Sequence, residues 1–108
     1  MKKGEIWFVE IPRTNGREQR GLRPVVLMSE AEADTILITP LTSNIRALKY
    51  PHTVEITPSK DNGLKRISIA LVFQLRAIDI KRLDNKIGIL EGSSLTEIEG
   101  MMRDILKI

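Results

Sequence analysis

The sequence predicts a mainly β protein with one C-terminal α-helix, folded as a small barrel or a strongly bent sheet. Short segments rich in β-branched and aromatic residues recur up to residue 90, and Gly, Pro and Asn separate them. Beyond residue 94 the apolar residues repeat at helical spacing instead. The chain has 108 residues, a length that rarely divides into two cores, so residues 1–108 are expected to form a single domain.

Three strands are expected in the first half of the chain. Each is short and rich in β-branched or aromatic residues, and a proline stands at one of its ends, where the ladder of hydrogen bonds needs no donor. They are residues 5–11, closed by Pro12, residues 24–28, which begin with Pro24, and residues 35–39, closed by Pro40.

Two polar loops follow the first and the third of these strands. Residues 13–22 contain Gly16 and Gly21 and show no apolar period. A loop of about ten residues without secondary structure, in so small a domain, is more often functional than decorative. Residues 41–50 form the second loop, which is also basic.

Further strands are expected between residues 53 and 90. The continuous apolar run of residues 68–73 is typical of a central strand that is covered on both faces. The other segments are residues 53–56, residues 76–80 after a bend, and residues 86–90.

The C-terminal segment is expected to be a helix with one apolar stripe. Ser94 and Glu97 have the spacing of a capping box, in which each side chain binds a free backbone N–H group of the first turn. The methionine pair of the stripe is interpreted as part of the core. The stripe consists of Leu95, Ile98, Met101, Met102, Ile105 and Leu106.

The composition excludes several kinds of site. Hydrophobic residues make up 42% and charged residues 29%, as in an average globular protein. The chain contains no cysteine, which excludes disulfides, thiolate nucleophiles and zinc–thiolate sites. Its single histidine, His52, excludes a mechanism with two imidazoles. No signal peptide or membrane-spanning run is recognisable, so we expect a cytoplasmic protein without metal or cofactor.

Charge is distributed unevenly along the chain. Lysine and arginine number 17 against 14 acidic residues, for a formal net charge of +3. The basic residues gather in residues 11–23 and 46–66, whereas acids gather in residues 30–34 and 91–104. Two basic loops on one face would attract a polyanion, but on charge alone we favour the interpretation that they are ordinary charged surface loops.

Two segments are suited to binding an anion. Gly21 and Pro24 constrain the backbone around Arg23, whose guanidinium can hold a phosphate with two parallel hydrogen bonds. A cluster of hydroxyl groups, from Thr42 and Ser43, follows the third strand. By contrast, Trp7 and Phe8 are interpreted as core residues, and His52 as a solvated residue at a strand edge.

Four motifs, in this order along nearly the whole chain, resemble the MazF/PemK family of toxin endoribonucleases. They are Gly-Glu-Ile-Trp at residues 4–7, Glu-Gln-Arg-Gly-Leu-Arg-Pro-Val at 18–25, Pro-Leu-Thr-Ser at 40–43 and Gln-Leu-Arg-Ala-Ile-Asp at 74–79. The resemblance implies an SH3-like barrel, a homodimer, and metal-independent cleavage of single-stranded RNA to 2′,3′-cyclic phosphate and 5′-hydroxyl ends. It also implies a cognate antitoxin with an acidic, partly disordered C-terminal segment.

The same resemblance implies roles for individual residues. Arg23 matches the catalytic arginine of the family and Thr42 its catalytic threonine, while Glu18 and Gln19 match its substrate-contacting loop. Apart from the resemblance, Glu18 is the remaining nearby carboxylate that could act as the base. Phe73 stands directly before Gln74, where some relatives carry an acid. The residues expected to bind RNA are Arg17, Gln19, Arg20, Ser43, Asn44, Gln74 and Arg76.

Two other classes of function remain open from the sequence. The CcdB type, which shares the fold, inhibits gyrase by binding and performs no chemistry. That type ends in Trp-Gly-Ile, whereas this chain ends in Leu106, Lys107 and Ile108. An SH3-like module that binds peptides is the other alternative, although it would need an exposed aromatic groove and this chain has only four aromatic residues.

Overall fold

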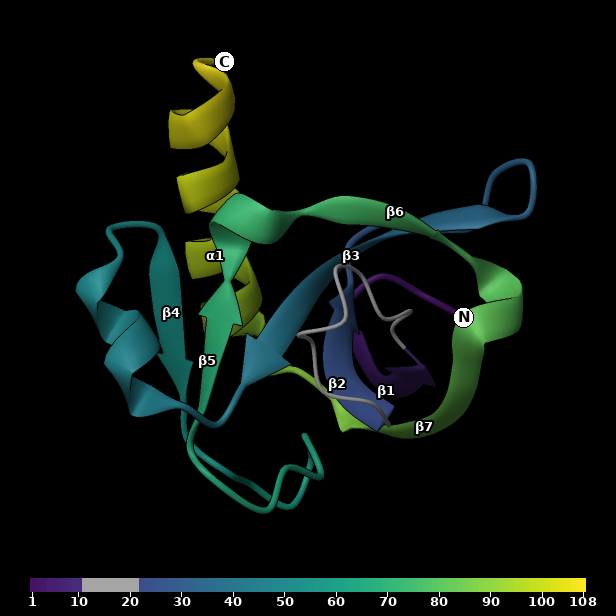
Figure 1. Cartoon of the computed structure of the whole chain (residues 1–108), viewed down its shortest axis with the longest axis horizontal. Coiled ribbons are helices and arrows are strands. Elements are labelled where there is room, and N and C mark those ends of the chain that lie inside the picture. The colour runs from purple at the N-terminus through teal and green to yellow at the C-terminus, as the bar shows by residue number, and fades with distance from the viewer. Residues whose placement is uncertain (11–21) are drawn as a thin grey trace, which may run out of the picture.

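The computed structural model describes residues 1–10 and 22–108. Its strands curve around one another, and the single α-helix of these described residues covers one side (Figure 1). The elements in chain order are β1 (Glu5–Glu10), β2 (Leu22–Leu27), β3 (Thr35–Thr42), the 3₁₀ helix η1 (Ile45–Lys49), β4 (Thr53–Ile56), β5 (Ser68–Leu71), η2 (Val72–Gln74), β6 (Arg76–Asp79), η3 (Ile80–Arg82), β7 (Leu83–Ile89) and α1 (Gly92–Leu106).

All strand pairs are antiparallel, in the order β4-β5-β3-β2-β1-β7, and β6 pairs with β3. The first half of β3 pairs with β6 and its last two residues pair with β5. Because η3 joins β6 to β7, and β7 pairs with β1, the strands curve into a barrel-like ring (Figure 1). The predicted mainly β barrel with a C-terminal helix is confirmed.

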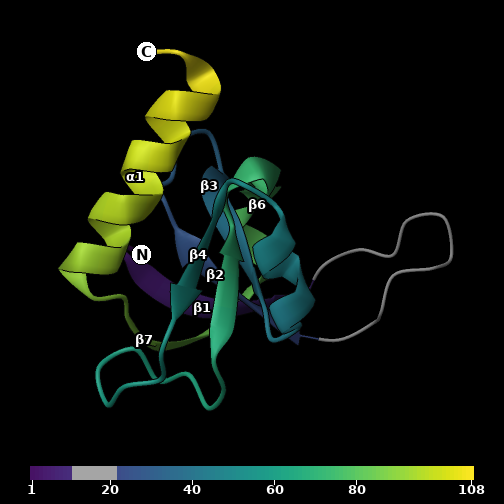
Figure 2. The ribbon, with the colours of Figure 1, turned by 90° about the vertical axis from the view of Figure 1, so that its left-hand side faces the viewer.

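Alternate residues of the central strands enter two separate cores. In β2, Val25 and Leu27 face the inside of the ring, whereas Val26 faces α1. Figure 2 shows α1 along one side of the strands. Ile98 is the fully buried residue of its apolar stripe, and the two adjacent methionines pack against the same core as predicted. This alternation is the period of a strand that is covered on both faces.

Two strands depart from their predicted bounds. Strand β3 continues through Pro40 to Thr42. It pairs with β6 up to Ile38 and with β5 from Leu41. Pro40 lies in the gap between these two partners, so its missing N–H group costs no ladder hydrogen bond. The run predicted as one strand over residues 68–73 ends at Leu71, and Phe73 is exposed on η2. Its first three residues are buried, and β5 has a partner strand on both sides, β4 and β3.

The predicted capping box is wrong. The helix begins at Gly92, two residues earlier than expected, and Leu95 donates the first helical hydrogen bond to the Glu91 carbonyl at 3.0 Å. Ser94 therefore lies inside the first turn instead of preceding it. The Glu91 carboxylate does not cap the helix, because Ser59 and Asn62 donate to it from another segment.

A buried carboxylate, which the sequence analysis missed, lies between β1 and β7. Glu5 is 8% exposed and accepts hydrogen bonds from Trp7 Nε1 at 2.9 Å and from Lys2 N–H at 3.1 Å. Lys86 Nζ lies 3.2 Å from its other oxygen. Burial alone would raise the pKa of Glu5, but these donors outweigh it and lower the pKa to about 2. Glu5 is therefore ionised in the folded protein at neutral pH.

Candidate active site

A hollow of about 650 Å³ opens where β2 and β3 part. Arg23 on β2 and Thr42 at the end of β3 both line it. The pairing of these two strands ends at Val25 and Pro40. If the same register is continued by two residues, Arg23 lies opposite Thr42. The fold therefore brings together two of the three residues predicted to be catalytic; the third, Glu18, lies outside the described residues.

Strand β1 holds the half-buried Arg23 from the other side. Val9 of β1 pairs with Arg23, and Phe8 pairs with Pro24. Phe8 is half-buried and lines the hollow beside the apolar Leu41 and Ile87. The residue predicted as core therefore forms part of the wall. An apolar wall excludes water, and charge interactions are stronger where water is excluded.

Two further cations reach this hollow from the turn of residues 57–67. Lys65 and Arg66 line it together with Ser43, which follows Thr42 directly. Both cations belong to the basic stretch of residues 46–66, but neither was predicted as a site residue. None of the described residues that line the hollow is acidic, so the site attracts anions. Its combination of guanidinium, ammonium and hydroxyl groups suits a phosphate.

Asn62 determines the shape of that turn. Its side chain is fully buried, with Oδ1 accepting from Ser59 N–H and Leu64 N–H, each at 3.0 Å. Its Nδ2 donates to the Thr57 carbonyl and to Glu91 Oε1, also at 3.0 Å. The Ser59 hydroxyl is the main cause that lowers the pKa of Glu91, and Asn62 adds to it. The turn is thereby tied to the start of α1 by an ionised carboxylate.

Two glycines let β7 approach this turn closely. Gly63 has φ +70°, and a Cβ there would lie 2.0 Å from the Ile87 carbonyl oxygen. A Cβ on Gly88 would lie 2.4 Å from backbone atoms of Asn62. Ile89 N–H also donates to the Asp61 carbonyl at 2.8 Å. Any side chain at these two positions would push the turn, with Lys65 and Arg66, away from the rest of the hollow.

A second hollow, of about 360 Å³, shares Thr42 with the first. Asn44 and Gln74, which were predicted to bind RNA, both line it. Thr42 Oγ1 accepts a hydrogen bond from Asn44 N–H at 3.2 Å, and Asn44 Oδ1 accepts from Arg46 N–H at 3.1 Å. Asn44 thus caps η1 and fixes its start beside Thr42.

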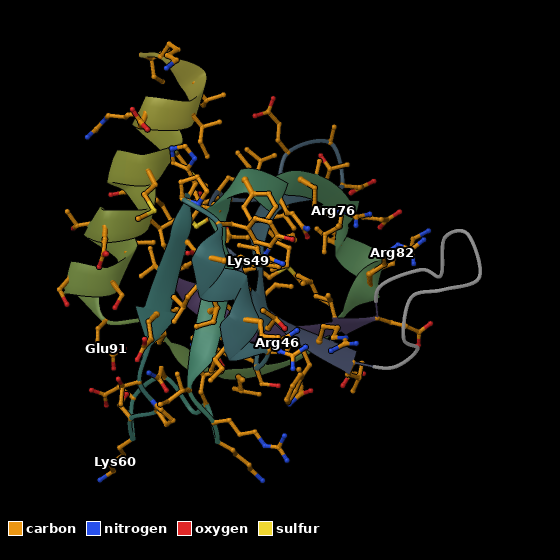
Figure 3. All side chains as sticks on the ribbon, turned by 60° about the vertical axis from the view of Figure 1, so that its left-hand side comes forward. Arg46, Lys49, Lys60, Arg76, Arg82 and Glu91 are labelled. Atoms are coloured by element: carbon orange, nitrogen blue, oxygen red, sulfur yellow. The ribbon has the colours of Figure 1, made fainter. Side chains whose placement is uncertain are left out.

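The structure does not bring every predicted residue to these hollows. Arg76 lies on β6, where it pairs with Ile38 of β3, and it lines neither hollow. Figure 3 shows it with Arg46, Lys49 and Arg82 on the part of the molecule that α1 leaves uncovered. The predicted residues Arg17, Glu18, Gln19 and Arg20 lie outside the described residues.

His52 directly precedes the edge strand β4 and is partly exposed, as predicted, but it also contacts the helix. Its Nε2 lies 2.6 Å from Oδ2 of Asp104 on α1, and this hydrogen bond lowers the pKa of Asp104. Neither hollow is lined by His52. The contact joins the strand that follows η1 to the helix, so we assign it a structural role.

The described residues contain no group of three or more His, Cys, Asp or Glu side chains that could hold a metal ion. In the same part of the chain, no helix is long and apolar enough to cross a membrane.

Residues 2–106 match the model of a family described as the PemK-like, MazF-like toxin of type II toxin–antitoxin systems. The Endoribonuclease EndoA of Bacillus subtilis is 31% identical over 103 residues, which are 92% of this chain and 88% of that protein. The Endoribonuclease MazF of Staphylococcus epidermidis is 29% identical over 106 residues, covering 94% and 88%. The crystal structure of MazE–MazF (Form-II) from Deinococcus radiodurans has a similar fold, with a TM-score of 0.77, 24% identity, and coverage of 100% of this chain and 96% of that one.

Proposed function

The chain belongs to the PemK-like, MazF-like toxin family of type II toxin–antitoxin systems, and we propose that it is an endoribonuclease that cleaves single-stranded RNA without a metal ion. The relatives named endoribonucleases support this class of reaction. The observation that carries the proposal is the hollow that Arg23, Lys65 and Arg66 line together with Thr42. Residues 1–108 would form one toxin domain that acts in the cytoplasm, where its RNA is found.

The proposed reaction is an in-line attack by a ribose 2′-hydroxyl on the adjacent phosphorus. The new bond from the 2′-oxygen to phosphorus closes the 2′,3′-cyclic phosphate while the bond to the 5′-oxygen of the next nucleotide breaks. That oxygen takes up a proton from water and leaves as the 5′-hydroxyl. Negative charge builds on the nonbridging oxygens during the attack, and the permanently charged Arg23 can neutralise it with two hydrogen bonds. Because Thr42 Oγ1 already accepts from Asn44 N–H, its own proton is available to donate to the phosphate and hold it in line.

A base must accept the proton of the 2′-hydroxyl. Arg23 is a poor base, since a guanidinium keeps its proton in water. None of the described residues that line the hollow is Asp, Glu or His. We therefore assign this role to Glu18, the carboxylate of the neighbouring motif. A Glu18→Gln variant is expected to lose the acidic limb of the pH–rate profile while it still binds an uncleavable RNA.

RNA binding would extend beyond the reacting phosphate. We propose that two copies of the chain form a homodimer and that RNA lies in a groove across its two-fold axis. The basic residues at 13, 17 and 20, with Lys49, would then line the groove twice. The solved MazE–MazF complex supports an antitoxin as a partner, and we propose that an acidic segment of that antitoxin is a second occupant of this groove. The proposed RNA-binding residues are Arg17, Gln19, Arg20, Ser43, Asn44, Gln74 and Arg76.

Alanine variants test the proposal. Arg23→Ala and Thr42→Ala are each expected to lose about 10²–10³ in cleavage rate, as when one transition-state donor is removed. Their controls are Arg103→Ala and Thr96→Ala, two exposed residues of α1. All four variants should keep the circular dichroism spectrum of the wild type. Full activity in folded Arg23→Ala would overturn the proposal, and a wild type that cleaves no RNA would favour a binding-only toxin.

A further inference from the structure

Two aromatic residues that the sequence analysis did not combine meet beside the proposed reaction centre. The ring centroids of Tyr50 and Phe73 lie 5.2 Å apart, and their planes are inclined at 56°. The two residues are 44% and 42% exposed, so a large part of this pair faces solvent. Lys49 Nζ lies 5.2 Å from the centroid of the Tyr50 ring. An exposed aromatic pair beside a cation is a surface on which a planar ligand can stack.

The surroundings of the pair indicate what that ligand is. Both rings line the second hollow with Asn44 and Gln74, whose amides can form hydrogen bonds to the edge of a base. Arg46 and Lys49 supply positive charge, and none of the described residues that line this hollow is acidic. The hollow therefore combines stacking surface, hydrogen-bonding amides and cations, which a nucleotide needs together.

The position of the hollow relates it to the reaction. Thr42 lines both hollows, with Arg23 in the first and the aromatic pair in the second. A phosphate held by Arg23 and Thr42 would leave one of its flanking nucleotides over the second hollow. We propose that Tyr50 and Phe73 stack against the base of that nucleotide and so contribute to the sequence preference of cleavage, an inference that rests on the proposed function.

A second copy of the chain is the competing occupant of this surface. A two-fold interface buries the same surface patch of both subunits. Arg46 and Lys49 of one copy would then lie close to Arg46 and Lys49 of the other copy, and these like charges would repel one another. That repulsion is absent when the occupant is a polyanion. The charge of the hollow therefore favours RNA.

The test uses a fluorescein-labelled 2′-O-methyl oligonucleotide of the sequence that the wild type cleaves best. Its affinity is measured by fluorescence anisotropy, next to a series in which single bases are removed. Phe73→Ala and Tyr50→Ala are expected to weaken binding by about 5- to 150-fold, the usual range for loss of one base–aromatic stack. Phe73→Trp should retain binding. The control is Leu48→Ala, which removes a side chain of similar exposure from η1 outside the hollow and should leave affinity unchanged.

The decisive observation is coupling between one base and one ring. Removing the stacked base should weaken wild-type binding as much as Phe73→Ala does, and the variant should lose nothing further on that abasic oligonucleotide. Additive losses at every position, or wild-type affinity in folded Phe73→Ala, would overturn the stacking site alone. A fall to monomer mass in light scattering would show that the pair binds a second copy instead. A wild type that neither cleaves nor binds RNA would overturn the proposed function and the stacking site with it.

Discussion

Replacing Asn62 by alanine removes the side chain that holds the turn of residues 57–67 in shape. Four hydrogen bonds are lost, and Leu64 N–H is left buried without that partner. A typical buried hydrogen bond contributes about 1 kcal/mol net, and one to a charged group contributes more. Water can reach the partly exposed Ser59 in the variant and replace part of what is lost. We therefore expect the free energy of unfolding to fall by roughly 3 kcal/mol, which is less than the sum over the four hydrogen bonds.

Urea unfolding at pH 7 and a fixed protein concentration measures this loss, and the single tryptophan, Trp7, reports it by fluorescence. The matched control is Asn85→Ala, an exposed asparagine on β7 that should change stability by less than about 0.5 kcal/mol. Below the midpoint, folded Asn62→Ala should also bind an uncleavable RNA more weakly, since Lys65 and Arg66 lose their position. A loss below about 1 kcal/mol would refute the role assigned to this side chain.

Three other predictions concern the close approach of β7, the buried carboxylate and the antitoxin. Gly88→Ala places a Cβ 2.4 Å from the backbone of Asn62 and should cost about 2–3 kcal/mol in urea unfolding, whereas Gly100→Ala, with nothing within 4 Å, should stabilise the helix. The pKa of Glu5 is about 2 when folded and near 4.5 otherwise, so its stabilisation is complete above pH 4.5 and is lost as the pH falls towards 2. The loss amounts to about 3 kcal/mol in the free energy of unfolding, and the Glu5→Gln variant should not show it. The prediction would be contradicted if the wild type and the variant lost the same stability between pH 4.5 and pH 2. An acidic antitoxin peptide should compete with uncleavable RNA for binding. Charge reversal at Arg17 and Arg20 should weaken the binding of both ligands, while reversal at Glu97 should weaken the binding of neither. An RNA affinity that saturating peptide leaves unchanged would exclude a shared groove.

Local patterns predicted the fold well where a segment keeps one environment along its length. The apolar stripe around Ile98 and the central strand that begins at Ser68 are examples. The errors fall where a tertiary partner changes the outcome. Pro40 does not end β3 because the strand changes partner there, and Ser94 does not cap the helix because the chain already turns helical at Gly92.

The candidate site divides in the same way. Arg23 and Thr42 could be selected from short motifs, and the structure brings them to one hollow. Lys65 and Arg66 could not, since they reach that hollow only through the turn that Asn62 organises. The Tyr50–Phe73 contact joins residues more than twenty positions apart, and no local pattern in the sequence indicates it.

The chemistry of the cut ends tests the central claim most directly. Wild-type protein is incubated with a defined single-stranded RNA in excess EDTA, and the products are analysed by mass spectrometry. We expect cleavage that leaves a 2′,3′-cyclic phosphate and a 5′-hydroxyl, at a rate about 10²–10³-fold lower in folded Arg23→Ala. Loss of wild-type activity in EDTA, or products that carry a 3′-hydroxyl and a 5′-phosphate, would contradict a reaction driven by Arg23 and Thr42.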